Sequence, residues 1–227
     1  SAEVIVATTR PETMLGDTAV AVNPLDKRFN GLIGKIALLP LTDREIPIIA
    51  DEYVEMEFGT GAVKITPAHD LNDFEVGQRH NLPIISVIGP DLKMTLAAGK
   101  FKGLKTKAAA AAVLEELQTQ GLIEKIEPYQ NAVSICERCK SVLEPLLAKQ
   151  WFVKIQHLAD PAIRAVKTGE IEFIPDHFQK VYMNWMENIH DWNISRQLWW
   201  GHRIPVYYCE NNPEHFVVSI DIVNKCP

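Results

Sequence analysis

The sequence predicts an α+β protein whose first part is a curled sheet or barrel with peripheral helices. Short β-type runs, separated by Gly, Pro and Asn or Asp, fill residues 1 to about 90. Two helical segments interrupt and follow these runs, and the character of the chain changes after about residue 125. We therefore divide the chain into a first domain (1–125), a connecting segment (126–150) and a third part (151–227).

The expected elements of the first domain follow the spacing of its apolar residues. β-type runs are expected at 4–7, 19–22, 36–39, 46–50, 62–66 and 84–88. A helix is expected at 70–80, because Asp70 is a favourable N-cap and Asp73 falls at the third helical position. A second helix is expected at 104–120, because it contains five consecutive alanines and Gly121 follows it as a favourable C′ residue.

Helical and extended segments alternate in the third part of the chain. Helices are expected at 158–167 and 177–188, and extended segments at 171–174 and 204–208. All five tryptophans lie in this part, which distinguishes it in composition from the first domain.

The composition narrows the possible functions. A net charge of -6 argues against a domain that binds nucleic acid over its whole surface, so any contact with nucleic acid should be local. No apolar run is long enough to cross a bilayer, and the first residues lack the basic region of a signal peptide. Four cysteines are too few for a disulfide scaffold, so we expect a reducing, cytoplasmic compartment. The abrupt entry into the run 4–7 suggests a piece of a longer protein.

One motif, residues 59–73, places several polar side chains around a strand and a helix start. Along a strand at 62–66, Lys64 and Thr66 share one face, and the apolar residues between them face the core. Asp70 and Asp73 project from the first helical turn on nearly the same side, where the helix N-terminus stabilises negative charge. Both carboxylates are therefore expected to be ionised near neutral pH and suited to hold an ammonium group. A capping arrangement without a ligand remains the alternative.

A second motif, residues 8–13, also has two interpretations. Thr9 and Glu12 fit a capping box with Pro11 in the first helical turn. The threonines and Arg10 of this motif could instead line a polar pocket. Together the two motifs offer hydroxyls, one Lys, one Arg and the two aspartates, but no Ser–His or Cys–His pair. Such a set suits the binding of a small zwitterion and attack on its ester.

Two further features leave alternatives open. Cys136 and Cys139 have the spacing of half a zinc site, but a lone pair could equally be reduced thiols. Gly59 and Gly61 permit either a close approach of the backbone to a ligand or simply a turn. His69 is as suited to fixing the turn before the helix as to proton transfer.

Three segments, 8–20, 58–73 and 194–205, resemble the editing region of class I aminoacyl-tRNA synthetases, most closely those of the valyl type. The resemblance runs nearly end to end. It implies that residues 1–125 are a β-barrel-like editing domain inserted into the nucleotide-binding fold. Residues 151–227 would be an incomplete, returning α/β segment of the split catalytic domain. The signatures of aminoacylation would lie outside this chain, which should not activate valine with ATP.

The implied activity is post-transfer editing, the hydrolysis of mischarged threonyl-tRNA(Val). A site that binds valine rejects threonine poorly, for which valyl-type enzymes are themselves the established example. The resemblance gives catalytic roles to Asp73, Lys64 and Asp70. It assigns substrate binding to the residues Thr8, Thr9, Arg10, Thr13, Phe58 and Thr66.

The resemblance also implies cofactors and partners. Editing would need no cofactor, zinc would belong to the full-length parent, and ATP and magnesium would serve only the absent synthetic site. The partner would be the 3′ end of tRNA(Val) carrying threonine, with no membrane and with the protein as a monomer. A non-catalytic tRNA-binding or docking module and an isoleucyl- or leucyl-type editor remain the alternatives.

Overall fold

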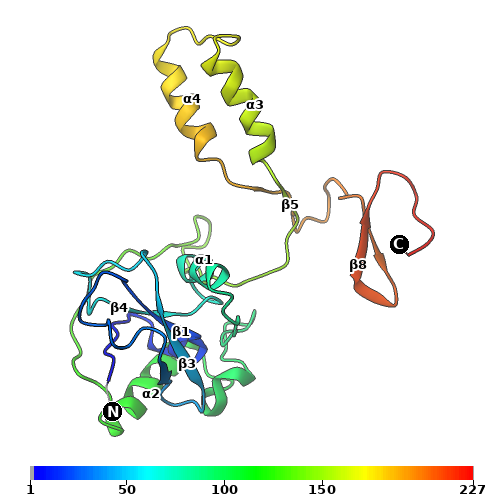
Figure 1. Ribbon diagram of the computed structural model, residues 1–227. Helices are drawn as coiled ribbons and strands as arrows, with labels where there is room; N and C mark the ends of the chain where they lie inside the picture. The colour runs from blue at the N-terminus through cyan, green and yellow to red at the C-terminus, as the bar shows by residue number, and fades with distance from the viewer. Residues whose placement is uncertain (1–2, 227) are drawn as a thin grey trace. The chain divides into compact units, whose positions relative to one another are not determined.

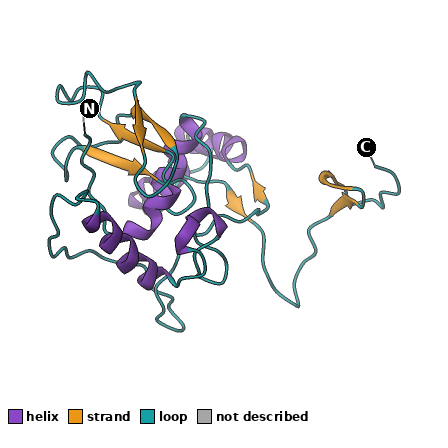
Figure 2. Cartoon of the chain, turned by 90° about the horizontal axis from the view of Figure 1, so that it is seen from below, coloured by secondary structure: helices purple, strands orange, loops and turns teal. Residues whose placement is uncertain are grey.

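The computed structural model describes residues 3–226. The chain folds as two units, Ser1–Leu147 and Ala148–Pro227, and each combines helices with strands (Figure 1). The predicted α+β class is therefore confirmed. Long loops connect the elements in both units (Figure 2). Within residues 3–226, none of the helices has the length and apolar character that crossing a membrane requires.

Among its described residues, the first unit contains four strands, two α-helices and two 3₁₀ helices. Their bounds are η1 Pro11–Gly16, β1 Ala19–Val22, β2 Ile36–Leu38, β3 Glu45–Ala50, β4 Ala62–Ile65, α1 Leu71–Arg79, η2 Leu96–Phe101 and α2 Thr106–Thr119. The second unit, as far as residue 226, contains two helices and two short ladders. Their bounds are β5 Phe152–Val153, α3 Gln156–Lys167, α4 His177–Glu187, β6 Trp192–Asn193, β7 Val206–Cys209 and β8 Asn212–Val218.

The strands of the first unit form one sheet in the order β2-β3-β1-β4. β1 runs parallel to β3 and antiparallel to β4, and β2 is antiparallel to β3. β2 and β4 are the two edges, so the sheet is open. The expected barrel is therefore not confirmed within the described residues, where the remaining ladders have two strands each.

β1 is buried on both faces and separates two apolar clusters. Ala19 and Ala21 face the smaller cluster, together with Ile65 of β4 and Val76 of α1. The valines of β1 face the larger cluster. Side chains alternate along a strand, so β4 directs Val63 and Ile65 to the smaller cluster and turns its other face away.

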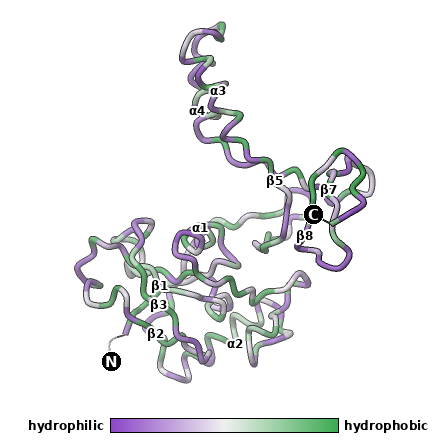
Figure 3. Tube along the Cα trace, turned by 45° about the vertical axis from the view of Figure 1, so that its right-hand side comes forward, coloured by the Kyte–Doolittle hydropathy of each residue, from purple (hydrophilic) through white to green (hydrophobic). Residues whose placement is uncertain are grey.

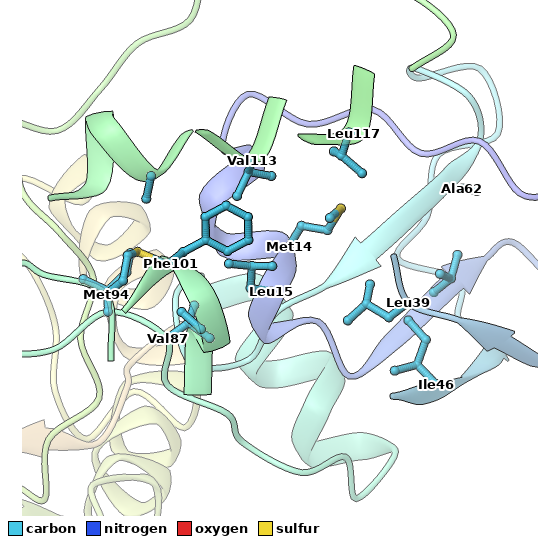
Figure 4. Packing of buried hydrophobic residues seen from close by; sticks show 14 of the residues in the cluster. Met14, Leu15, Leu39, Ile46, Ala62, Val87, Met94, Phe101, Val113 and Leu117 are labelled. Atoms are coloured by element: carbon cyan, nitrogen blue, oxygen red, sulfur yellow. The ribbon is translucent and has the colours of Figure 1, made fainter. Parts of the chain in front are cut away.

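The larger cluster joins η1 to the sheet and to α2. Met14 and Leu15 of η1 lie between Val113 and Leu117 of α2 on one side and Leu39 on the other (Figure 4). Leu15 is 1% exposed, which places it among the most buried side chains of the unit. This packing fixes η1 against the sheet, and η1 carries part of the polar cluster described below.

Two expected strands of the first unit are absent from the observed ladders. The run 84–88 forms only an isolated bridge at Ile88, because the backbone amides of Val87 and Ile88 donate to Nε2 of His69, at 2.9 and 3.3 Å. A side-chain acceptor thus replaces the carbonyls of a neighbouring strand. The run 4–7 packs Val4 and Val6 on the larger cluster without joining a ladder.

The predicted capping box is also wrong. η1 begins at Pro11 with Arg10 as its N-cap, and no side chain caps it. Instead of Thr9, the hydroxyl of Thr8 accepts a hydrogen bond, from the backbone amide of Arg10 at 3.0 Å. The helix caps predicted elsewhere are confirmed: Asp70 caps α1, and Gly121 follows α2 with a φ of 68°.

The second unit matches its predicted helices more closely than its predicted strands. α3 and α4 fall on the expected segments 158–167 and 177–188, whereas 171–174 forms no strand. Hydrophobic and hydrophilic residues are interspersed along both helices (Figure 3). No residue of α4 is buried in the described part of the chain, and Trp185 is 73% exposed.

His69 should be essential for the stability of the first unit. The ring is 1% exposed, and its Nε2 acts as acceptor, so the ring proton sits on Nδ1. Burial, and to a smaller extent the charges of Arg10 and Lys64, lowers its pKa from 6.5 to about 4. His69→Ala would leave two buried amides without an acceptor, at about 1–3 kcal/mol each in the free energy of unfolding.

Urea denaturation between pH 4 and 8 tests this prediction. Since the folded-state pKa lies below the unfolded one, this imidazole stabilises the fold fully above pH 6.5. That contribution, about 3 kcal/mol, is lost as the pH falls towards 4. His69→Ala should lack this component of the pH dependence, and His80→Ala should keep it. Equal pH dependence in wild type and His69→Ala would contradict the assignment.

Candidate functional site

A polar cluster forms where β4 ends and α1 begins. Thr66 follows β4 directly, Asp70 is the N-cap of α1, and Asp73 lies in the first turn of that helix. Thr13, on η1, reaches the same place from the other side. The antiparallel register of β1 and β4 pairs Val20 with Lys64, which directs the lysine to the face opposite Val63 and Ile65. The predicted division of this strand into a polar and an apolar face is thus confirmed.

Lys64 is the centre of the cluster. Its Nζ donates to the hydroxyl of Thr66 at 2.6 Å and to the hydroxyl of Thr13 at 3.2 Å. Each hydroxyl passes its own proton onward. Thr13 donates to the backbone carbonyl of Arg10 at 2.9 Å, and Thr66 donates to Oδ1 of Asp17 at 2.5 Å. Both threonines therefore turn their lone pairs toward the ammonium group.

The two carboxylates of α1 are fixed by backbone amides. Oδ2 of Asp73 accepts from the backbone amide of Thr66 at 2.9 Å, which ties the helix to the end of β4. Oδ1 of Asp70 accepts from the amides of Asn72 and Asp73, at 2.9 and 3.1 Å. The second oxygen of each carboxylate accepts no hydrogen bond from the described residues.

Burial works against the charge of Asp73. The residue is 6% exposed, and desolvation raises its pKa, although the Thr66 amide and Lys64 both pull in the other direction. The neighbouring Asp70 adds to the rise. The stabilisation expected from the helix N-terminus is therefore opposed by burial, which the sequence pattern did not reveal.

Arg10 lies on the side of the cluster formed by η1, and several groups hold its guanidinium. Its guanidinium donates to Oε1 of Glu12 at 3.3 Å and to the backbone carbonyl of His69 at 3.2 Å. It also forms an ion pair with Glu144, a residue of the segment that the sequence identified as connecting. Thr13 connects Arg10 to Lys64: its amide and hydroxyl both donate to the Arg10 carbonyl, and its hydroxyl accepts from Lys64.

Three predicted substrate-binding residues lie outside this hydrogen-bond network. Thr8 caps the backbone of Arg10, while the side chain of Thr9 has no hydrogen bond among the described residues. Phe58 is 63% exposed and lies in the turn before β4, where its backbone carbonyl accepts from Gly61. The structure thus brings Lys64, Thr66 and Asp73 together. Asp70 is exposed and accepts from the amides of its own helix start, and Phe58 and Thr9 lie on the surface.

The glycines and His69 have structural roles here. A side chain at Gly61, whose φ is 77°, would collide with the guanidinium of Arg28 and the carbonyl of Met56. The close approach at this turn is therefore to the protein itself. His69 is neutral near pH 7 and already accepts two amides, so it fixes the turn before α1 and is not placed for proton transfer.

The predicted metal ligands make half a site. Cys136 and Cys139 lie on the same turn, with the thiol of Cys139 within 3.3 Å of the Ser141 hydroxyl. A structural zinc site takes four ligands. In the described part of the chain, no group of three or more His, Cys, Asp or Glu side chains is placed to hold a metal. The residues present therefore do not complete a zinc site.

Asp17 and Glu144 belong to the site but were not predicted. Asp17 is 2% exposed and its only sequence signal is a charge placed just before the apolar run of β1. Glu144 lies 134 residues from Arg10, and no local pattern connects them.

Comparison with known proteins identifies a family and close relatives. The family model described as "tRNA synthetases class I (I, L, M and V)" matches residues 8–226. Valine–tRNA ligase of Symbiobacterium thermophilum is 55% identical over 226 residues, which are 100% of this chain and 25% of the relative. The enzyme of the same name from Carboxydothermus hydrogenoformans is 58% identical over 222 residues, with 98% and 25% covered.

A solved structure, "The crystal structure of GlLeuRS-CP1", is similar with a TM-score of 0.45 and 16% identity, covering 56% of this chain and 83% of that one. At that level the likeness carries no further conclusion. The chain spans about a quarter of the length of the curated relatives it matches. Because the family model covers nearly every residue described, the chain belongs to the class I tRNA synthetases of the isoleucine, leucine, methionine and valine group.

Proposed function

We propose that the first unit hydrolyses the ester of threonyl-tRNA(Val), the post-transfer editing reaction of a valyl-type synthetase. One observation carries the proposal. An ammonium donor, two threonine hydroxyls and the Asp73 carboxylate converge at the end of β4, with Asp70 at the same helix start and without a Ser–His or Cys–His pair among the described residues. Family membership and the names of the close relatives support the same reaction.

The carboxylates are suited to the substrate's α-ammonium group. Asp73 keeps one oxygen free while its other oxygen is fixed by the Thr66 amide, so the free oxygen is preoriented. Asp70 presents a second acceptor from the neighbouring position of the same helix end. A cation bound here would also favour the ionised form of Asp73, whose pKa burial raises.

Lys64 is suited to the ester. An ammonium group held by two hydroxyls presents its remaining N–H in a fixed direction, and a positive charge stabilises the oxyanion that forms when water attacks a carbonyl. An aminoacyl ester is already reactive, so a positioned water and oriented charges suffice without a nucleophilic side chain. Lys64 side-chain exposure is 12%, which strengthens its field at the site.

The hydroxyls of Thr13 and Thr66 would give selectivity for threonine. Each accepts one hydrogen bond from Lys64 and donates its proton elsewhere, so one lone pair remains for a donor. A threonyl hydroxyl supplies that donor and a valyl methyl group does not. Valine would leave these lone pairs without a donor, which disfavours it relative to threonine by the net value of a hydrogen bond, about 0.5–1.5 kcal/mol.

The remaining parts of the proposal concern partners and context. The partner is the 3′ end of tRNA(Val), and the protein acts as a monomer in the cytoplasm. The hydrolysis uses no cofactor, while ATP and magnesium belong to the synthetic reaction of the whole enzyme. The second unit corresponds to a returning segment of the catalytic domain.

Asp73→Asn should remove the negative charge of Asp73 while it keeps the hydrogen bond to the Thr66 amide. The amide oxygen can still accept from the Thr66 backbone, whereas Asp73→Ala would leave that buried amide unpaired and destabilise the fold by about 1–3 kcal/mol. We expect Asp73→Asn to lower kcat/KM for threonyl-tRNA(Val) by about tenfold to a hundredfold, the effect of losing one charged hydrogen bond. Release of labelled threonine measures this rate.

The control is Asp91→Asn, which removes an exposed carboxylate outside the cluster. Its rate should equal that of the wild type. If Asp73→Asn hydrolysed threonyl-tRNA(Val) at the wild-type rate, Asp73 would not bind the ammonium group of the substrate. Tight binding of tRNA without ester cleavage by the wild type would favour the docking module instead.

Thr13→Val should reduce selectivity. The substitution keeps the shape of the side chain but removes an acceptor for the substrate and one of the two hydroxyls that hold Lys64. Hydrolysis of threonyl-tRNA(Val) should therefore fall about three- to tenfold more than hydrolysis of valyl-tRNA(Val). Thr18→Val is a matched control, because Thr18 is equally buried and its hydroxyl has no partner among the described residues. A panel that includes isoleucyl- and leucyl-tRNA substrates would expose a different editing specificity.

A further inference from the structure

Asp17 lies beneath the cluster and is itself out of reach of a substrate. It is 2% exposed and sits between η1 and β1, where its backbone amide donates to the Met14 carbonyl. Its Oδ1 accepts the Thr66 hydroxyl proton at 2.5 Å and lies 3.6 Å from Nζ of Lys64. Asp17 therefore acts on the site only through these two side chains.

This contact differs from those of two other buried carboxylates of the unit, Asp51 and Asp26. The Asp51 carboxylate lies 3.0 and 3.1 Å from Nη2 of Arg79 and 2.8 Å from Nε2 of His80. The Asp26 carboxylate accepts from Nη2 of Arg28 at 2.6 Å. In both cases an arginine donates directly to the carboxylate. At Asp17 the nearest cation stays beyond hydrogen-bond distance, and a hydroxyl stands between the two charges.

This arrangement fixes the direction of the Thr66 hydroxyl. Because its proton points to Asp17, its lone pairs face Lys64 and the free side of the cluster. If Asp17 carried a proton, it could donate to Thr66, and the hydroxyl would lose the partner that orients it. An ionised carboxylate can only accept, so it fixes the order Lys64 to Thr66 to Asp17, whereas a protonated carboxyl also allows the reverse hydrogen bond.

The charged groups that face Asp17 are Lys64 on β4, Asp73 on α1 and Arg44 before β3. Burial raises the pKa of Asp17 to about 7, against the pull of Lys64 and Thr66, and Asp73 raises it further. The carboxyl therefore changes its protonation state near neutral pH, and the ionised form predominates above about pH 7.

We propose that Asp17 is a positioning residue, which orients Thr66 and Lys64 for the hydrolysis by holding the Thr66 hydroxyl proton and facing the lysine from beneath. The inference rests on the proposed function. It predicts that the kcat of the wild type rises with pH, giving a limb in the pH–rate profile with its midpoint near pH 7. The ordered arrangement is present above that pH and lost below it.

The test compares Asp17→Asn, Asp17→Ala and the control Asp51→Asn in the full 227-residue chain, with kcat and KM for threonyl-tRNA(Val) between pH 5.5 and 8.5. Asp17→Asn keeps an acceptor for Thr66 but cannot ionise. We expect its kcat to fall about tenfold with KM within twofold, and the limb near pH 7 to disappear. Asp17→Ala should lose up to about a hundredfold in kcat, because it leaves the buried Thr66 hydroxyl without an acceptor.

Asp51→Asn loses a buried carboxylate away from the cluster, so it controls for lost stability and should keep both the kcat and the limb of the wild type. Urea denaturation establishes that each variant is folded under the assay conditions. An unchanged kcat and an unchanged limb in folded Asp17→Asn would overturn the inference while leaving the proposed function in place.

A measurement without substrate separates the two proposals. The ¹⁵Nζ resonance of Lys64 should titrate with a midpoint near pH 7 in the wild type, reporting Asp17, and this step should vanish in Asp17→Asn. If the wild type hydrolyses no threonyl-tRNA(Val), the proposed function fails, and this resonance still decides the positioning of Lys64. A Lys64 resonance that is the same in both proteins would overturn the inference.

Discussion

The pairing of β1 with β4 is the constraint on which the site depends. Four residue pairs set the register, and the amide of Thr18 extends it by donating to the carbonyl of Ile65. This extension brings Asp17 beside Thr66. A slip by one residue would turn Lys64 into the smaller apolar cluster and bring Ile65 to the polar side. The hydrophobic clusters on the two faces of β1 therefore fix the position of the charged groups as well as the fold.

The bond between Asp73 and the Thr66 amide makes the second connection. It joins the first turn of α1 to the residue after β4, while Asp70 caps the same helix. Side chains that resemble ordinary helix caps thus also determine where the carboxylates lie. Capping and ligand binding are compatible at this position, because each carboxylate uses one oxygen for the backbone and retains the other.

The electrostatics of the cluster oppose its stability. Asp17 and Asp73 both have raised pKa values because burial disfavours their charges, and a single lysine lies between them. Elsewhere in the unit, Asp51 has a lowered pKa: burial alone would raise it, but Arg79, the Tyr53 amide and His80 outweigh that effect. Unfavourable burial of charge concentrated in one place is typical of functional sites, and the apolar packing around β1 offsets it.

Local patterns in the sequence determined the strands at 19–22, 36–39, 46–50 and 62–66, the Asp70 cap, and the face shared by Lys64 and Thr66. These features follow from the alternation of side chains and from capping chemistry, which act over a few residues. The tertiary structure alone decided that 84–88 would form a single bridge and no strand, because His69, 18 residues before Val87, accepts its amides. It also decided the open sheet, the orientation of Thr66 by Asp17 and the pairing of Arg10 with Glu144. Burial and contacts between distant segments set these features, and no local sequence pattern encodes them.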